Sequence, residues 1–175
     1  MKVLVTAASK YGSTAEIAQA IGDVLITHRF DVAALPFDAV EAVDDYDAVV
    51  LGSAVYAGHW LSPAKEFVEQ HAQALAARPV WLFSSGPVGV PPKPGEDPVD
   101  AKSMVEACAA RDHRVFAGKL DRSRLGFADK AIAVALRSPH GDFRDWSQIR
   151  TWASHIANAL QSQESQRRDE TPPCA

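Results

Sequence analysis

A short loop near the start of the chain carries the residue types that bind phosphate. Ser9, Ser13 and Thr14 offer hydroxyl donors, and Gly12 lets the backbone approach closely or adopt a positive φ. The apolar run Val3-Leu4-Val5 precedes the loop and a helical pattern follows it, so the first helical N–H groups are free to bind an anion. The same pattern also fits an ordinary strand-to-helix turn in which a hydroxyl only caps the helix.

The loop matches neither of two familiar nucleotide-binding motifs. It lacks the GxxxxGK[ST] of nucleoside triphosphate sites and the GxGxxG of dinucleotide sites. We therefore expect a ligand with a single terminal phosphate.

Two further loops, Ser53–Trp60 and Ser84–Pro98, are expected beside the first one. Stacking on Tyr56 or Trp60 would hold a flat ring, and such stacking contributes about 0.5–1.5 kcal/mol beyond area burial. Together with the phosphate loop, they indicate a phosphorylated planar heterocycle. Both aromatic residues also fit a role in packing beneath the loop, and His59 also fits a solvated loop residue.

No residues of the sequence form a recognisable acid–base set. Neither a Ser–His–Asp arrangement nor paired carboxylates can be read, and the cluster Asp44-Asp45-Asp47 suits a solvated connection. Cys108 and Cys174 lie far apart, which disfavours a zinc site or a structural disulfide. We therefore assign no metal and no catalytic side chain, and any redox chemistry must come from a cofactor.

Strands and helices alternate along the chain. The continuous apolar run 48–52 is typical of a strand buried on both faces of a parallel sheet. Strands are predicted at 3–5, 31–35, 48–52, 79–83 and 113–120, and helices at 13–28, 62–75 with Ser62 as N-cap, 100–110, 128–136 and 146–160 with Asp145 as cap. This alternation predicts an α/β fold with a doubly wound parallel sheet, whose ligands bind at the carboxyl ends of the strands.

Length and composition limit the class of protein. The 175 residues suffice for one domain, predicted over 1–160, and residues 161–175 read as a flexible polar tail. A formal net charge of −4 without a basic stripe disfavours nucleic-acid binding. No apolar run approaches the roughly 18 residues of a membrane span. Because the chain enters a strand at once, we expect no signal peptide and a cytoplasmic location.

Several stretches resemble the flavodoxin-like family, and in particular its menaquinone-dependent protoporphyrinogen oxidase branch. The loop Ser9–Thr14 resembles the FMN phosphate loop of flavodoxins, although Tyr11 stands where flavodoxins usually have Thr. The stretches similar to the oxidase branch are Tyr11–Ala18, Val50–Ser53 leading to Gly58-His59, Glu66–Ala72, Phe116–Leu120 and Asp145-Trp146. The resemblance spans about residues 1–160.

This resemblance implies strand order 2-1-3-4-5 with helices on both faces of a five-stranded sheet, and non-covalent FMN. The implied FMN-binding residues are Ser9, Lys10, Tyr11, Gly12, Ser13, Thr14, Ala54, Val55, Tyr56, Ala57, Gly58, His59, Trp60, Ser84, Ser85, Gly86, Pro87, Val88 and Gly89. The branch's insertion would be residues 121–142 and would carry substrate or quinone contacts. Here it is less basic and aromatic than in the branch, so porphyrinogen oxidation and peripheral membrane contact stay open.

Three functions follow as hypotheses. The first is an FMN-dependent oxidoreductase that passes electrons from a reduced substrate, such as a porphyrinogen, to a quinone or a redox protein. The second is a one-electron carrier of the flavodoxin type. The third is a flavin-free interaction or regulatory domain, which the Tyr11 substitution keeps open.

Overall fold

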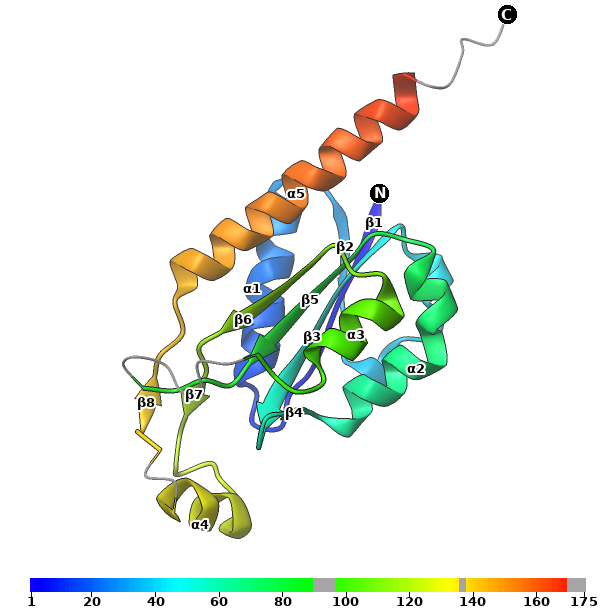
Figure 1. The fold of residues 1–175 in the computed structure, drawn as a ribbon. Helices are drawn as coiled ribbons and strands as arrows, with labels where there is room; N and C mark the ends of the chain where they lie inside the picture. Colours follow the sequence, from blue (N-terminus) through cyan, green and yellow to red (C-terminus); the bar gives the residue numbers. More distant parts are fainter. Residues whose placement is uncertain (90–96, 136–137, 170–175) are drawn as a thin grey trace, which may run out of the picture.

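The computed structural model describes residues 1–89, 97–135 and 138–169 (Figure 1). Predictions for 90–96 in the Pro- and Gly-rich loop, for 136–137 at the end of the insertion helix and for 170–175 in the tail lie outside the described residues.

A parallel sheet forms the centre of the molecule (Figure 1). Its parallel strands are β1 (Lys2–Ala8), β2 (Asp31–Ala34), β3 (Ala48–Tyr56), β5 (Val80–Ser85) and β6 (Asp112–Phe116), in the order β2-β1-β3-β5-β6. Strand β3 is central because its apolar run, Ala48–Leu51, is buried on both faces. The predicted doubly wound order is therefore confirmed.

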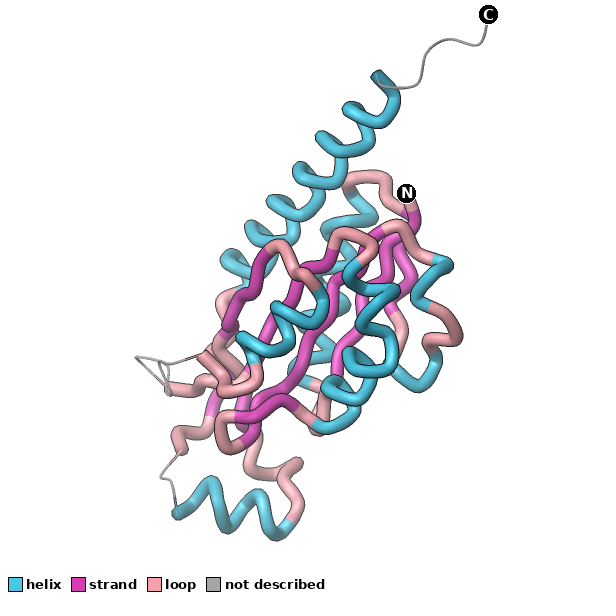
Figure 2. Tube along the Cα trace, turned by 45° about the vertical axis from the view of Figure 1, so that its right-hand side comes forward, coloured by secondary structure: helices cyan, strands magenta, loops and turns pink. Residues whose placement is uncertain are grey.

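Helices cover both faces of the sheet (Figure 2). Helices α1 (Ser13–Thr27) and α5 (Trp146–Asp169) pack on one face, around a core that includes Ile21, Phe83 and Trp152. Helices α2 (Ser62–Ala76) and α3 (Ala101–Cys108) pack on the other face, over a core that includes Leu51 and Phe67. The connection after β2 contains the 3-10 turns η1 (Phe37–Ala39) and η2 (Val43–Asp45).

Two helix ends differ from their predictions. Helix α5 continues to Asp169, so the predicted helix end at Leu160 is wrong. The residues from Gln161 onward contain no Gly or Pro before Pro172, and nothing in their sequence stops the helix. Ser62 lies inside α2, where Leu61 occupies the N-cap position without a side-chain hydrogen bond.

The cap predicted for α5 is confirmed. The Asp145 carboxylate accepts hydrogen bonds from the backbone N–H groups of Ser147 and Gln148, at 2.9 and 3.0 Å. These contacts satisfy two of the donors that a helix start leaves free.

After β6 the chain leaves the central sheet and forms a separate two-stranded sheet. Strand β7 (Lys119–Leu120) pairs antiparallel with β8 (Gly141–Asp142), and helix α4 (Phe127–Ala135) lies between them in the sequence. The predicted strand 113–120 is therefore broken at Phe116. Just after the break, the Gly118 backbone packs closely on that of Gly86, where a Cβ on Gly118 would lie 3.3 Å from the Gly86 Cα.

Helix α4 lies beyond the carboxyl end of the sheet (Figure 1). Phe127 is 93% exposed and Val134 is 57% exposed, so this side of the helix does not pack on the domain. Arg144, two residues after the end of β8, is buried and donates to the Glu16 carboxylate at 2.7 Å and to the Ser13 carbonyl at 3.2 Å. This arginine ties the end of the insertion to the start of α1.

Candidate functional site

The three predicted loops meet at one edge of the sheet. In the register of the parallel strands Ser53 pairs with Ala8 on one side and with Ser84 on the other. The carboxyl ends of β1, β3 and β5 therefore lie side by side. This is the edge at which ligands bind in open α/β sheets.

The first loop has an unsatisfied donor at the start of α1. Gly12 takes the N-cap position in the left-handed region, with φ of 87°, and its carbonyl accepts the Glu16 N–H at 2.9 Å. The Ser13 hydroxyl is buried and has no hydrogen-bond partner among the described residues. Thr14 is buried and Ser9 is half-buried. A buried hydroxyl without a partner beside free helical N–H groups fits a site for a phosphate ligand.

The second loop is a hairpin, and the prediction of a loop from Ser53 is wrong. Strand β3 runs through Ala54 and Val55 to Tyr56, and the chain returns as β4 (His59–Trp60), which pairs with β3. The two turn residues, Ala57 and Gly58, have φ of 50° and 82°. Positive φ at both positions is the type I′ geometry, which matches the twist of the two strands.

The two aromatic residues of the hairpin differ in burial. Tyr56 is 37% exposed, whereas Trp60 is 2% exposed and packs between the sheet and α2. The Trp60 indole N–H donates to the Ser84 hydroxyl at 2.8 Å, and that hydroxyl also contacts His113 Nε2 at 2.8 Å. Trp60 therefore packs beneath the site in this structure, and Tyr56 is the aromatic side chain that borders the site.

Tyr56 stays neutral in its surroundings. Desolvation raises the pKa of Tyr56 to about 12, with smaller contributions from Tyr11 and Asp129. Desolvation also lowers the pKa of His113, which favours its neutral form beside Ser84. Tyr56 and His113 are therefore both uncharged at neutral pH.

The third loop starts later than predicted. Ser84 and Ser85 are buried residues of β5, and the irregular segment begins at Gly86. A Cβ on Gly86 would lie 3.0 Å from the Cβ of Val55, so the two backbones are in close contact. The Pro87 carbonyl accepts the Gly118 N–H at 2.7 Å. Val88 and Gly89 follow and are half-buried, and residues 90–96 lie outside the described part of the chain.

The insertion contacts the first loop through charged and polar side chains. The Asp129 carboxylate of α4 lies 2.6 Å from Lys10 Nζ and accepts a hydrogen bond from the Tyr11 hydroxyl. The Tyr11 oxygen also accepts the Gly126 N–H at 3.0 Å. Hydrogen bonds from Lys10 and Tyr11 lower the pKa of Asp129, so the carboxylate is charged at neutral pH. The Lys10 ammonium also lies over the Tyr56 ring, 5.4 Å from its centroid.

A cleft lies between the first loop, the hairpin and the insertion. Its lining residues are Tyr11, Ser13, Tyr56, Lys119, Leu120, Asp121, Arg124 and Leu125. The sequence placed the first three in the site. The sequence assigned the other five residues only to the predicted fifth strand or to the insertion. Nothing in the sequence pattern of these five residues shows that the β7–β8 pair brings them close to α1.

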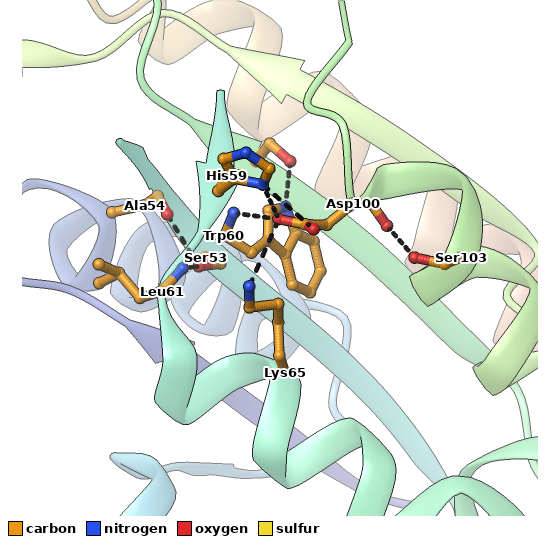
Figure 3. A network of polar contacts seen from close by, with 9 residues as sticks. Ser53, Ala54, His59, Trp60, Leu61, Lys65, Asp100 and Ser103 are labelled. Carbon is orange, nitrogen blue, oxygen red and sulfur yellow. Dashed lines mark hydrogen bonds and ion pairs between the residues drawn. The ribbon is translucent and has the colours of Figure 1, made fainter. Parts of the chain in front are cut away.

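A polar network braces the hairpin from α3 (Figure 3). The Asp100 carboxylate accepts the Trp60 backbone N–H at 2.8 Å and contacts His59 Nδ1 at 3.2 and 3.3 Å. Burial raises the pKa of Asp100, but the hydrogen bonds from Trp60 and His59 and the charge of Lys65 outweigh it and lower the pKa overall. The sequence indicated Asp100 only as the start of a helix.

Neither a metal site nor a membrane span is found among the residues that the structure describes. No group of three or more His, Cys, Asp and Glu side chains is placed to hold a metal ion within the described ranges. In the same ranges, no helix has the length and apolar character needed to cross a bilayer.

Comparison with known proteins identifies a family and related folds. Residues 4–147 match the flavodoxin domain family. The chain is 27% identical over 173 residues to protoporphyrinogen IX dehydrogenase [quinone] of Escherichia coli strain K12, covering 90% of this chain and 96% of the relative. The same identity and coverage are found with that enzyme from E. coli O157:H7.

Solved structures agree on the fold. A flavodoxin from the domain Archaea superposes with a TM-score of 0.63 at 19% identity, covering 92% of this chain and 99% of that one. Flavodoxin 1 from Bacillus cereus superposes with a TM-score of 0.63 at 14% identity, covering 90% of this chain and 98% of that one. At such identities the likeness concerns the fold alone.

Proposed function

Because the flavodoxin domain match spans most of the chain, the protein belongs to the flavodoxin family, and we propose that it is an FMN-binding oxidoreductase. It would pass electrons from a reduced substrate to a quinone or a redox protein. The observation that carries this proposal is the buried, unpartnered Ser13 hydroxyl at the start of α1. The family and its relatives support a flavodoxin-type redox function, and the donor and acceptor belong to the proposal.

The described residues suit both the phosphate and the flavin ring of FMN. The segment Ser9–Thr14 would hold the phosphate with hydroxyls and free helical N–H groups. The hairpin from Ala54 to His59 and the segment Gly86–Gly89 would border the flavin ring, with Tyr56 as its aromatic neighbour. Trp60, Ser84 and Ser85 would support these segments from beneath. When bound, the flavin supplies the hydride and electron chemistry for which the protein has no side-chain set.

An acidic organic substrate such as a porphyrinogen suits the cleft. The E. coli relative is named for protoporphyrinogen IX and quinone. Here Lys119 and Arg124 line the cleft, and both can pair with carboxylates of a substrate. Asp121 lies 4.0 Å from Arg124 and offsets part of its charge. We extend the proposal to a porphyrinogen donor and a quinone acceptor in a cytoplasmic protein.

One observation favours a flavin-free interaction domain as a second candidate. The Asp129 carboxylate lies 2.6 Å from Lys10, next to the proposed phosphate site. A carboxylate there neutralises the nearby cation and repels an incoming phosphate. If this repulsion dominates, the protein binds no FMN and keeps only the fold.

Spectroscopy of the purified protein separates the two candidates. We expect either a yellow protein or quenching of FMN fluorescence with a one-to-one endpoint. Ser162→Ala, on the exposed surface of α5, provides a control that keeps the affinity of the wild type. Absence of quenching at high micromolar FMN would select the flavin-free domain. Anaerobic turnover of protoporphyrinogen with a naphthoquinone then tests the substrate. If the FMN-loaded protein does not turn over, the protein is a one-electron carrier of the flavodoxin type.

A further inference from the structure

The ring of His59 is held in one orientation by Asp100. Its Nδ1 lies 3.2 and 3.3 Å from the two carboxylate oxygens (Figure 3). The lowered pKa of Asp100 keeps this carboxylate charged at neutral pH, so Nδ1 carries a proton. The second nitrogen, Nε2, is then the atom that gains or loses a proton. The His59 side chain is 52% exposed, so a proton donor or acceptor can reach it.

Asp100 is itself fixed by contacts from three directions. It accepts the Trp60 N–H at 2.8 Å, and Lys65 of α2 lies 3.9 Å away. The neighbouring Val99 N–H donates to the Gly58 carbonyl at 2.9 Å, which joins the start of α3 to the hairpin turn. The carboxylate is 17% exposed. The pair therefore has a fixed place relative to the hairpin.

The hairpin register places His59 at the border of the site. His59 pairs with Tyr56 across the antiparallel hairpin, and paired residues project from the same face. Tyr56 lines the cleft. Among the described residues, the titratable groups around His59 are Asp100 at the N-cap of α3, Lys65 on α2 and Tyr56 on β3. Of these, only Asp100 touches the imidazole.

We propose that His59 carries a proton at Nε2 during the two-electron reaction, with Asp100 as its positioning residue. The inference rests on the proposed function. A reduced substrate loses two electrons and two protons. One proton would leave with the electron pair as hydride, which is the chemistry that a bound flavin supplies, and the other would go to His59 Nε2. His59 later returns this proton to the quinone as the quinone takes up the hydride equivalent. The His59 side chain then regains its first state, and the two electrons and two protons leave with the hydroquinone.

A purely structural brace is the alternative, and the tautomer of His59 tests the geometry without any turnover. Nitrogen-15 NMR of the unloaded protein near neutral pH should show His59 protonated at Nδ1. In Asp100→Asn, which can offer Nδ1 either an oxygen or an N–H, this preference should weaken to a mixture of tautomers. The signals of His155, which is exposed on α5, should be the same in both proteins. A mixture in the wild type, or no change on substitution, would overturn the assignment of Asp100.

Reoxidation of the reduced protein by a quinone tests the proton transfer. The FMN-loaded protein is reduced with dithionite without oxygen and mixed with a water-soluble naphthoquinone over a range of pH. In the wild type we expect a rate that depends on pH, because a titratable side chain delivers the proton. His59→Gln should be slower by about 100-fold, as is typical when a general acid is lost, and its rate should vary less with pH.

The controls separate the failure of this inference from that of the proposed function. Asp100→Asn should change the pH profile of the wild type, because the His59 ring loses the carboxylate that orients it. His155→Gln should keep the wild-type profile. If all FMN-loaded variants share one rate and one profile, the inference is overturned and the oxidoreductase stands. If the wild type binds no FMN, the proposed function is overturned and the inference with it.

Discussion

The phosphate loop and the hairpin border the same cleft but differ in how their polar groups are satisfied. In the hairpin, the Trp60 indole N–H reaches Ser84 at 2.8 Å and the Trp60 backbone N–H reaches Asp100 at 2.8 Å. The Ser53 hydroxyl accepts the Leu61 N–H at 3.0 Å beneath it. In the phosphate loop, the Ser13 hydroxyl is buried without a partner among the described residues.

This difference indicates separate roles for the two regions. A network whose donors and acceptors are all paired is rigid before any ligand arrives, and it stabilises the fold. A buried hydroxyl without a partner costs stability, and a ligand that pairs with it recovers that cost. The hairpin therefore acts as a preformed wall, and the phosphate loop acts as the part of the site completed by the ligand. Four substitutions test this contrast.

Removal of Trp60 should have the largest effect. We expect Trp60→Ala to lower the free energy of unfolding by about 3–5 kcal/mol, because it leaves a cavity between the sheet and α2. Tyr56→Ala, at an exposed position of the same hairpin, should cost about 1 kcal/mol. Urea unfolding measures both. Equal losses of unfolding free energy for the two variants would contradict the conclusion that Trp60 packs beneath the site while Tyr56 borders the cleft.

Replacement of Asp100 should have the next largest effect. Asp100→Asn weakens charge-assisted hydrogen bonds to Trp60 and His59 and should cost about 1–3 kcal/mol at neutral pH. The pKa of Asp100 is lowered on folding from 3.8, so its carboxylate stabilises the protein above that pH. The difference in the free energy of unfolding between wild type and variant should therefore become smaller as the pH falls below 3.8. A gap that is constant down to pH 2 would show that the charge is irrelevant.

Gly12→Ala should lower the free energy of unfolding by a smaller amount, because Gly12 has a left-handed conformation. A Cβ at Gly12 meets no atom within 4 Å, so Gly12→Ala is penalised only by its φ of 87°. We expect a loss of about 1 kcal/mol in the free energy of unfolding. Gly126→Ala is the matched control, because its φ is not in that region and its Cβ would lie 3.5 Å from the Tyr11 hydroxyl. Thermal unfolding of both variants measures the difference.

Ser13→Ala should have the smallest effect on stability and a clear effect on binding. The substitution removes a buried hydroxyl that has no partner, so the unfolding free energy should stay the same or rise slightly. FMN affinity should fall by roughly 0.5–1.5 kcal/mol, the typical contribution of one hydrogen bond. Fluorescence titration and urea unfolding on the same sample measure the two quantities. A loss of stability with unchanged affinity would reverse the roles assigned to the two regions.

The sheet order and the meeting of three loops could be predicted because they depend on local patterns. The apolar run from Ala48 to Leu51 indicates a central parallel strand, and the small residues before Ser13 indicate a strand-to-helix turn. The hairpin could not be predicted in the same way. Ser53 and Ala54 have weak strand propensity, and they are strand residues only because β1 and β5 pair with them.

Contacts between residues that lie far apart in the sequence could not be predicted either. Asp100, Asp129 and Arg144 look like ordinary charged residues at helix starts or in a polar insertion. Their contacts join segments that only the folded chain brings together, as in the pairing of Arg144 with Glu16. The burial of Trp60 likewise depends on α2 and Ser84. The sequence left both a packing role and a stacking role open for Trp60.

A parallel titration of the wild type with FMN and with riboflavin tests the phosphate site most directly. The two ligands share the flavin ring and differ in the terminal phosphate. If the loop Ser9–Thr14 binds that phosphate, FMN should bind more tightly than riboflavin by about tenfold or more, since charge-assisted hydrogen bonds are stronger than neutral ones. Equal affinity for the two ligands, or binding of neither, would contradict a phosphate site at the start of α1.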